Sequence, residues 1–311
     1  MLNNLHMHLS VVSTLYNSEK NIEEFLNRII VQASTISEKY EIILVDDGSS
    51  DETLSLTRSL LQKHKNIRLF ELSKNFGHHR AMMTGLMKAT GDYIFLIDSD
   101  LDEPPELLSE FYALIQDREV DVVYGSQIER KGKFFERVIG HFAWNLIDLL
   151  SEIRIPRNLS TVRLMRRKYV QSLVKHRERK TAIGGLWELT GFKQVGFQFK
   201  KNLRDNSDYS FRQRLAALLD SITSFSERPL YFVFFLGVSI FILSALVALS
   251  LIVWRITGAL LEGWVSILVS VWLLGGILLL CIGIIGLYIS RIFIETKQRP
   301  YSIIRNEYNS D

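Results

Sequence analysis

Residues 93–102 read YIFLIDSDLD, and this stretch decides the fold. Five apolar or aromatic side chains lead into carboxylates at alternate positions, Asp98, Asp100 and Asp102. An apolar run with Gly91 before it and acids after it predicts a buried strand that delivers those acids to its carboxyl end. In an open α/β sheet, ligands bind at that end. Because such closely spaced carboxylates repel one another, we expect a divalent cation with oxygen ligands beside them; the alternative is a strand that runs into a solvated acidic turn.

Segments around this stretch alternate between strand-like and helix-like patterns. The predicted strands cover residues 9–16, 41–45, 67–72, 93–97 and 120–124. The predicted helices cover residues 19–37, 77–89 and 106–115, and another ends near residue 64. Regular alternation of this kind is typical of a parallel sheet with helices on both faces. The fold class predicted from the sequence is therefore α/β.

A second predicted strand also ends in acids. Asp46 and Asp47 follow residues 41–45, and Gly48 permits a tight turn before Ser50 or Asp51 caps the next helix. Two strand ends that carry acids suit a nucleoside diphosphate, with one acid for the base or ribose and the other group for a cation on the phosphates. An ordinary turn is the alternative for this segment.

The overall composition argues against a nucleic-acid-binding protein and excludes disulfides and cysteine-based metal clusters. The 37 basic and 34 acidic side chains give a net charge of +3, which argues against a dedicated nucleic-acid-binding protein. Cys281 is the single cysteine, so the chain forms no intramolecular disulfide and no multi-cysteine metal cluster. With 311 residues and 47% hydrophobic content, the chain has material for one large core and a further region.

The further region contains two long runs without charged side chains, residues 231–254 and 264–290. Each exceeds the roughly 20 apolar residues that cross a bilayer core, so two transmembrane helices are predicted. Apolar residues at helical spacing between 211 and 225 predict an amphipathic helix at the membrane interface. The polar N-terminus does not fit a signal peptide. The predicted parts are an α/β domain (1–209), a juxtamembrane amphipathic helix (210–230), two transmembrane helices (231–290) and a tail (291–311).

Basic residues near the ends of the two apolar runs predict the orientation. Arg228 precedes the first run and Arg291 follows the second, each with further basic residues nearby, whereas the connecting loop carries only Arg255 and Glu262. The positive-inside bias therefore places both termini and the α/β domain in the cytoplasm, with the chain crossing the cytoplasmic (inner) membrane twice. Glycines in the second run permit close helix contacts within or between chains.

Four motifs in this order resemble glycosyltransferase family 2. They are Tyr16-Asn17 after the first strand, VDDGSSD at 45–51, NFGH at 75–78 and DSDLDEPPE at 98–106. More narrowly, they are similar to the polyisoprenyl-phosphate glycosyltransferases, which include dolichol-phosphate mannose synthase and bacterial undecaprenyl-phosphate glycosyltransferases. The resemblance covers essentially the whole chain, because membrane-bound members of that group also end in two spanning helices. It implies a Rossmann-like GT-A catalytic domain, a nucleotide-sugar donor and Mg²⁺ or Mn²⁺ as cofactor.

The resemblance also implies a role for each matched residue. The residues expected to contact the nucleotide sugar are Tyr16, Asp46, Asp47, Asp98, Lys201 and Arg204. The expected cation ligands are Asp98, Asp100 and Asp102, with Asp102 standing where many relatives carry glutamine. The expected catalytic residues are Asp98, Asp100 and Arg163. Lys201 and Arg204 match a basic loop that closes over the donor diphosphate. Apart from the resemblance, His78 is a candidate for the rim of the site, with a surface or packing role as the alternative.

One departure from the family pattern bears on the acceptor. Thr161 stands where relatives carry an aspartate treated as a candidate base, and a threonine hydroxyl cannot act as a base at ordinary pH. A lipid phosphate needs no base, since its second ionisation has a pKa of about 6 and it is largely dianionic at neutral pH. It needs cationic contacts instead. Arg163 is the candidate phosphate contact, with a structural salt bridge as the alternative.

The predicted function is metal-dependent, inverting transfer of one hexosyl or N-acetylhexosaminyl group from a nucleotide sugar to polyprenyl (undecaprenyl) phosphate at the cytoplasmic leaflet, for modification of cell-surface polysaccharide. The donor alternatives are UDP-glucose, UDP-galactose, UDP-N-acetylglucosamine and GDP-mannose. The alternative acceptors are diacylglycerol and a lipid-linked oligosaccharide. Because Thr161 replaces the candidate base, a non-catalytic membrane scaffold that binds nucleotide sugar is a further alternative. A flippase and further copies of the chain, in a homo-oligomer, are the other partners considered.

Overall fold

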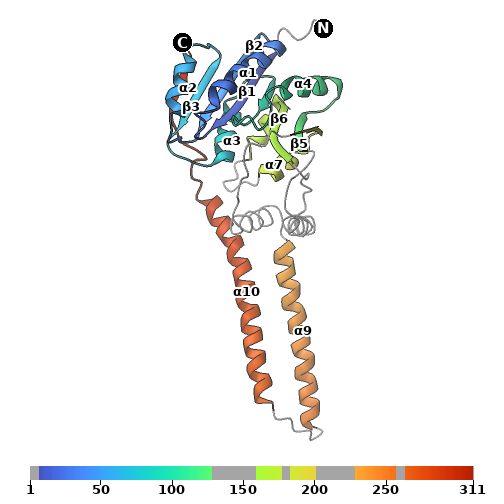
Figure 1. The fold of residues 1–311 in the computed structure, drawn as a ribbon. Coiled ribbons are helices and arrows are strands. Elements are labelled where there is room, and N and C mark those ends of the chain that lie inside the picture. The colour runs from blue at the N-terminus through green and yellow to red at the C-terminus, as the bar shows by residue number, and fades with distance from the viewer. Residues whose placement is uncertain (1–6, 128–158, 177–182, 201–227, 257–262, 311) are drawn as a thin grey trace. The chain divides into compact units, whose positions relative to one another are not determined.

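The computed structural model describes residues 7–127, 159–176, 183–200, 228–256 and 263–310 (Figure 1). The chain divides into two compact units. The first contains residues 1–137, 154–209 and 299–311, and the second contains residues 138–153 and 210–298. The C-terminal residues therefore belong to the same unit as the N-terminal α/β region, although a long stretch of the second unit separates them in sequence.

An eight-stranded sheet forms the centre of the first unit, with the strand order β7-β5-β6-β4-β1-β2-β3-β8. The strands are β1 (His8–Leu15), β2 (Lys39–Asp46), β3 (Ile67–Leu72), β4 (Tyr93–Leu96), β5 (Val122–Gln127), β6 (Leu159–Arg166), β7 (Gln194–Phe199) and β8 (Ile304–Asn309). The four neighbours β4, β1, β2 and β3 are mutually parallel. β6 runs antiparallel to both β4 and β5, and β8 runs antiparallel to β3.

The prediction of a parallel sheet is therefore right for the first four strands and wrong for the whole sheet, which is mixed. The regular strand–helix alternation ends after β5, and the strands that follow enter the sheet by other connections. Every strand and helix predicted from the pattern up to residue 124 is present, with ends within about three residues of the expected ones.

Helices cover both faces of the sheet, as predicted. On one face lie α1 (Ile22–Ile36), α2 (Thr53–Leu61) and α4 (Leu107–Asp117). Their apolar residues and those of the strands form one core, which includes Phe25, Phe95 and Phe111. On the other lie α3 (His78–Lys88), α6 (Arg167–Leu173) and α7 (Ile183–Leu189), which share a core with Val12, Met82 and Leu186. Buried apolar strands between two helical layers fix the sheet, so its carboxyl-terminal edge is a stable platform for the loops that follow.

The last strand, β8, was not predicted. Residues 291–311 were expected to form a tail, but residues 304–309 pair with the edge strand β3. The carboxylate of Glu71 in β3, which is 6% exposed, accepts hydrogen bonds from Arg305 (3.1 Å), Asn306 (2.8 Å) and the hydroxyl of Tyr308 (2.8 Å). β8 is mostly polar and lacks the apolar alternation of a half-buried strand. Its backbone pairs with β3, its polar side chains bond to Glu71, and only Ile304 and Tyr308 pack against the core.

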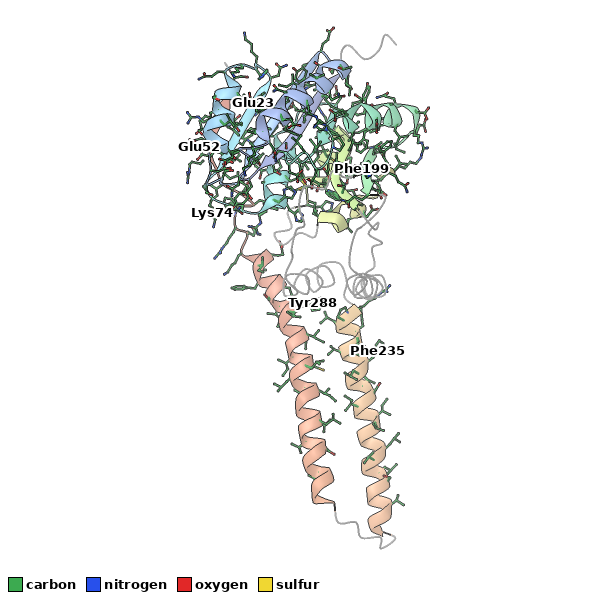
Figure 2. The ribbon with its side chains drawn as sticks, in the orientation of Figure 1. Glu23, Glu52, Lys74, Phe199, Phe235 and Tyr288 are labelled. Carbon is green, nitrogen blue, oxygen red and sulfur yellow. The ribbon has the colours of Figure 1, made fainter. Side chains whose placement is uncertain are left out.

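The second unit contains two long helices, α9 (Arg228–Ile256) and α10 (Trp264–Thr296), at the positions of the two predicted spans. Apolar side chains along them, among them Phe235 at 62% exposed, project outward (Figure 2). Within the described residues, one stretch, Leu273–Thr296, is long and apolar enough to cross a membrane, with a mean hydropathy of 2.5. The anchor of two spans stays a prediction, and the amphipathic helix expected before it lies almost wholly outside the described residues.

Candidate active site

Four of the expected donor-site residues, Tyr16, Asp46, Asp47 and Asp98, lie at the carboxyl-terminal edge of the parallel strands. β1 lies between β4 and β2, so the direction in which strands are added reverses at β1. Tyr16 directly follows β1, Asp46 ends β2, and Asp98 lies two residues beyond β4. The register pairs Leu15 with Asp46 and places Val12 beside Leu96. Ligands of open α/β sheets bind at such a reversal point, in the crevice outside the strand ends.

The acidic segment after β4 is a tight turn anchored by its apolar residue. Leu101 adopts a φ of +63°, which a non-glycine residue rarely does, and its side chain is 4% exposed. The backbone N–H of Asp102 donates to Oδ1 of Asp100 (3.0 Å), and the buried hydroxyl of Ser99 donates to the carbonyl of Thr14 (3.0 Å). Burial of Leu101 offsets the backbone strain, so the turn presents its acids at the sheet edge in a defined arrangement.

The carboxylates of this turn are the expected ligands of a divalent cation. Within the part of the chain that the structure describes, no three histidine, cysteine, aspartate or glutamate side chains are grouped closely enough to hold a metal ion. Asp98 and Asp100 nevertheless supply hard oxygen donors on one turn, the ligand type that Mg²⁺ and Mn²⁺ prefer. Mg²⁺ sites in phosphoryl enzymes use one or two carboxylates plus substrate phosphates and water. Two carboxylates on one turn thus fit a cation site of this kind, which takes its other ligands from substrate and water.

Asp46 and Asp47 are nearly inaccessible, at 1% and 2% exposed, and each holds a loop beside the site. Asp46 accepts hydrogen bonds from the backbone N–H of Ser49 (3.2 Å) and from its hydroxyl. Asp47 accepts hydrogen bonds from the backbone N–H groups of Phe76 (2.7 Å) and Gly77 (2.9 Å). Burial raises the pKa of both carboxyls above the usual aspartate range, against the opposing effect of these hydrogen bonds.

The loops that these two aspartates hold pack directly against each other. Gly48 has a φ of +71°, and a Cβ there would lie 2.6 Å from the amide nitrogen of Asn75 and 2.7 Å from the carbonyl carbon of Lys74. No side chain fits in that space, which explains the glycine in the VDDGSSD motif. The two motifs that the sequence showed separately, VDDGSSD and NFGH, therefore form one wall of the site.

His78 connects this wall to the acidic turn. Its Nδ1 lies 3.1 Å from the hydroxyl oxygen of Thr14, and its Nε2 lies 3.5 Å from Oδ1 of Asp98. Burial lowers the pKa of the imidazole, although Asp100 and Asp47 act in the opposite direction. The sequence placed His78 at the rim of the site but gave no partner for it, because Thr14 and Asp98 are distant in sequence.

Arg163, the expected phosphate contact, is fully buried in β6 beside Leu96 of β4. Its Cζ lies 3.0 Å from the ring centroid of Trp187, and its Nε donates to the carbonyl of Thr161 (3.3 Å). Nη1 and Nη2 have no hydrogen-bond partner among the residues that the structure describes, and burial lowers the pKa of the guanidinium to about 10. The ring of Trp187 stacks on the guanidinium, so Arg163 is not accessible to a ligand in this arrangement.

The remaining expected residues are less closely defined. Tyr16 is 53% exposed at the end of β1 and is available for a ligand. Thr161 lies half-buried in β6, next to Ser160, whose hydroxyl donates to the carboxylate of Glu103. Lys201 and Arg204 lie outside the described residues. Glu103 and Ser160 join the acidic turn to β6, a link that the sequence did not indicate.

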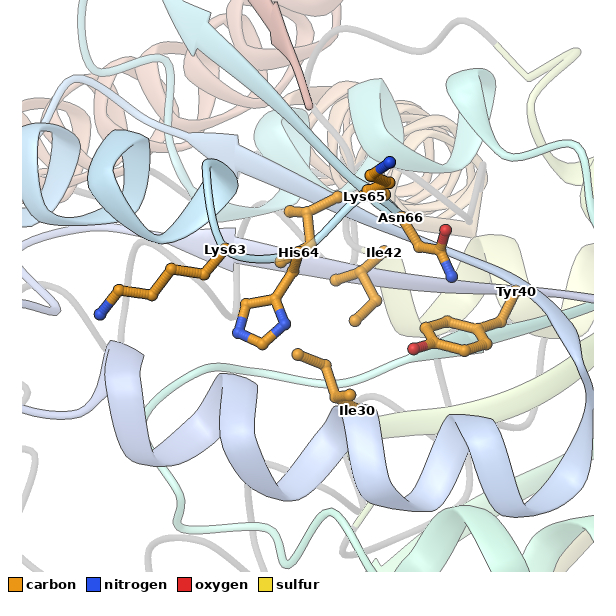
Figure 3. Close-up of a pocket in the computed structure, with 8 residues that line it drawn as sticks. Ile30, Tyr40, Ile42, Lys63, His64, Lys65 and Asn66 are labelled. Carbon is orange, nitrogen blue, oxygen red and sulfur yellow. The ribbon is translucent and has the colours of Figure 1, made fainter. Parts of the chain in front are cut away.

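A pocket of about 190 Å³ lies away from this site, at the amino ends of β2 and β3 (Figure 3). Tyr40, Lys63, His64 and Asn66 are among its lining residues. Because the acids lie at the carboxyl ends of the same strands, the pocket and the candidate active site occupy opposite edges of the sheet.

One family model and three relatives bear on this site. The model of glycosyl transferase family 2 matches residues 10–174, from β1 to the end of α6. The chain is 48% identical over 306 residues to a Mycobacterium tuberculosis protein whose name places it among glycosyltransferases, covering 98% of this chain and 90% of that one. It is 31% identical to an Escherichia coli prophage bactoprenol glucosyl transferase homolog (96% and 99% covered). It is 29% identical to the undecaprenyl-phosphate 4-deoxy-4-formamido-L-arabinose transferase of Photorhabdus laumondii (96% and 93% covered).

Proposed function

The chain belongs to glycosyltransferase family 2, and from this premise we propose that it transfers one sugar from a nucleotide-sugar donor to a polyprenyl phosphate such as undecaprenyl phosphate. The observation that carries the proposal is the convergence of Tyr16, Asp46 and Asp98 at the strand reversal beside β1. That is where an α/β sheet binds a nucleotide. The names of the relatives in Escherichia coli and Photorhabdus laumondii support the lipid acceptor.

The donor occupies the edge of β1, β2 and β4. Tyr16 offers an exposed ring to the base, and Asp46 and Asp47 lie beside it, at the end of β2. The family pattern assigns Lys201 and Arg204, which lie outside the described residues, to the diphosphate. Since Asp46 and Asp47 already hold two loops, they act on the nucleotide partly by shaping the wall that it contacts.

Asp98 and Asp100 would hold Mg²⁺ or Mn²⁺, with Asp102 as a third carboxylate on the same turn. When bound, the cation neutralises the charge that develops on the nucleoside diphosphate as it leaves. The protein contributes by fixing these carboxylates on a turn whose Leu101 is buried. Orientation achieved before the donor binds costs nothing during the reaction.

The acceptor needs no general base. A lipid phosphate with a second pKa of about 6 is a nucleophile at neutral pH. Its oxygen attacks the anomeric carbon from the face opposite the diphosphate, so the configuration inverts. Arg163 grips the phosphate once Trp187 has moved from the guanidinium, and Thr161 carries no proton in the reaction.

The membrane region delivers the acceptor. A lipid with a polyprenyl tail stays in the bilayer, so an enzyme that uses it benefits from a membrane anchor. α9 and α10, with 29 and 33 residues, are long enough at about 1.5 Å per residue to serve as the two spans. The excess of basic residues outside the connecting loop supports a catalytic domain at the cytoplasmic leaflet.

The proposal is tested with the purified full-length protein and radiolabelled UDP- and GDP-sugars. The candidate acceptors, undecaprenyl phosphate, diacylglycerol and a lipid-linked oligosaccharide, are supplied separately with Mn²⁺. We expect a labelled lipid only with undecaprenyl phosphate, stable to base and labile to mild acid. Labelling of diacylglycerol instead would contradict the assignment of polyprenyl phosphate as the acceptor. Binding of the nucleotide sugar without transfer to any acceptor would favour a non-catalytic scaffold.

A further inference from the structure

We propose that His78 is a positioning residue for Asp98. Its imidazole lies between the hydroxyl of Thr14 and the carboxylate of Asp98, and it orients that carboxylate before the cation and the donor diphosphate bind. This inference rests on the proposed function, because Asp98 is a cation ligand only in that reading. It adds a residue from α3 to a site otherwise built from β1, β2 and the turn after β4.

The two ring nitrogens of His78 face different partners. Nδ1 is 3.1 Å from Oγ1 of Thr14, and Nε2 is 3.5 Å from Oδ1 of Asp98. When the hydroxyl of Thr14 donates to Nδ1, the ring proton is on Nε2 and points toward Asp98. The separation of 3.5 Å is longer than a hydrogen bond, and catalytic contacts commonly tighten when the ligand binds.

The chain on either side of His78 is itself held in place by hydrogen bonds. Gly77, with a φ of +97°, turns the chain into α3, and the N–H of Gly77 is bound by Asp47. Further along α3, the hydroxyls of Thr84 and Ser302 are hydrogen-bonded at 2.6 Å. The helix that carries the imidazole is thus held by Asp47, directly after β2, and by Ser302 of the C-terminal segment.

A group that orients a metal-binding carboxylate changes metal affinity. Partners of ligating side chains fix the orientation of those ligands, and their removal typically weakens metal binding or activity by about 10- to 100-fold. Asp98 lies beyond the end of β4, on a turn rather than in the ladder of the sheet. The contact with the imidazole favours one orientation of this carboxylate, so removing it adds orientations that cation binding must then restrict.

The experiment is a titration of the full-length protein with Mn²⁺ alone, and again with UDP or GDP, in which the electron paramagnetic resonance signal reports free Mn²⁺. The variants are His78→Ala, His78→Gln, whose amide nitrogen replaces Nε2, and Thr14→Val, which removes the hydroxyl. His64→Ala is the matched control, because His64 lines the pocket at the opposite edge of the sheet (Figure 3).

We expect the Mn²⁺ dissociation constant to rise about 10- to 100-fold in His78→Ala, to return most of the way in His78→Gln, and to rise less in Thr14→Val. His64→Ala should bind Mn²⁺ as the wild type does. Unchanged affinity in His78→Ala, no Mn²⁺ binding by the wild type, or equal weakening in the Ala and Gln variants would each overturn the proposal.

Sugar transfer measured on the same samples separates this inference from the proposed function. If the wild type transfers no sugar but the variants follow the expected order of Mn²⁺ affinities, the proposed function fails and the role of His78 stands. If the wild type transfers sugar to undecaprenyl phosphate and His78→Ala has wild-type Mn²⁺ affinity, the proposed function stands and the role of His78 fails.

Discussion

Replacing Gly48 with alanine tests whether the close contact between the two loops beside the donor site matters. The φ of +71° at Gly48 is one that L-residues rarely adopt. A Cβ at this position would lie 2.6 Å from the backbone nitrogen of Asn75 and 2.7 Å from the backbone carbonyl carbon of Lys74. Because both atoms belong to the backbone, no side-chain rotation relieves the clash, and one of the two loops must shift.

Gly191 provides a matched control for the backbone strain. Its φ of +68° is nearly the same, and a Cβ there would meet nothing within 4 Å. Gly191→Ala therefore carries the strain alone, about 1–3 kcal/mol for a non-glycine residue in this conformation. Gly48→Ala carries the same strain and also displaces the loop that Asp47 binds through Phe76 and Gly77. The difference between the two variants isolates the loop contact.

Thermal unfolding and nucleotide titration measure the two consequences. At roughly 2–4 °C per kcal/mol for a domain of this size, Gly191→Ala lowers the unfolding temperature by several degrees, and Gly48→Ala lowers it further. Calorimetric titration with UDP and GDP should show weakened binding in Gly48→Ala and wild-type binding in Gly191→Ala. Equal unfolding temperatures for the two variants, with wild-type nucleotide affinity in Gly48→Ala, would refute the reasoning.

Further substitutions test the C-terminal strand and the buried arginine. Burial alone would raise the pKa of Glu71, but hydrogen bonds from the β8 residues outweigh burial and lower this pKa. The ionised carboxylate therefore stabilises the fold at pH values above its unfolded pKa of about 4.3. This stabilisation is lost as the pH falls through the lower pKa of the folded state. Acid unfolding of Glu71→Gln should therefore be less steep below about pH 4.3, and a curve as steep as that of the wild type would contradict this. Tyr308→Phe should cost about 1–3 kcal/mol in chemical unfolding, since the bond is to a charged group, without changing the KM for the donor. Arg163→Met should leave the unfolding temperature unchanged or raised, because it removes a buried guanidinium, and should raise the KM for the lipid phosphate; an unchanged KM would assign Arg163 a structural role only.

The sequence predicted the part of the fold that depends on local pattern. The apolar run at 93–97 and the acids after it predicted β4 and the turn that follows, because the pattern of apolar and polar residues that indicates a buried strand is visible in neighbouring positions. The second acidic strand end at Asp46 was found in the same way. Since β1, β2 and β4 are parallel neighbours, these local signals also predicted which loops meet at one edge.

The parts that escaped prediction depend on pairing between distant segments. β8 is joined to β3 by bonds to Glu71 from residues more than 230 positions away, and no local pattern marks them. The contacts of His78 with Thr14 and Asp98 likewise become visible only when three elements are placed together. The burial of Arg163 beneath Trp187 is of the same kind, because it depends on α7 packing over β6.

The most direct test of the central claim compares the wild type with Asp100→Asn, a substitution that keeps the size of the side chain but removes its charge. The measurement is transfer of radiolabelled sugar to undecaprenyl phosphate by the full-length protein, as a function of Mn²⁺ concentration. We predict transfer by the wild type that requires Mn²⁺ and is lost with a chelator, and at least a 100-fold lower rate, on the order of one removed charge-stabilising group, in Asp100→Asn. Transfer by Asp100→Asn at the wild-type rate and with the same Mn²⁺ dependence would contradict the assignment of this turn as the catalytic centre.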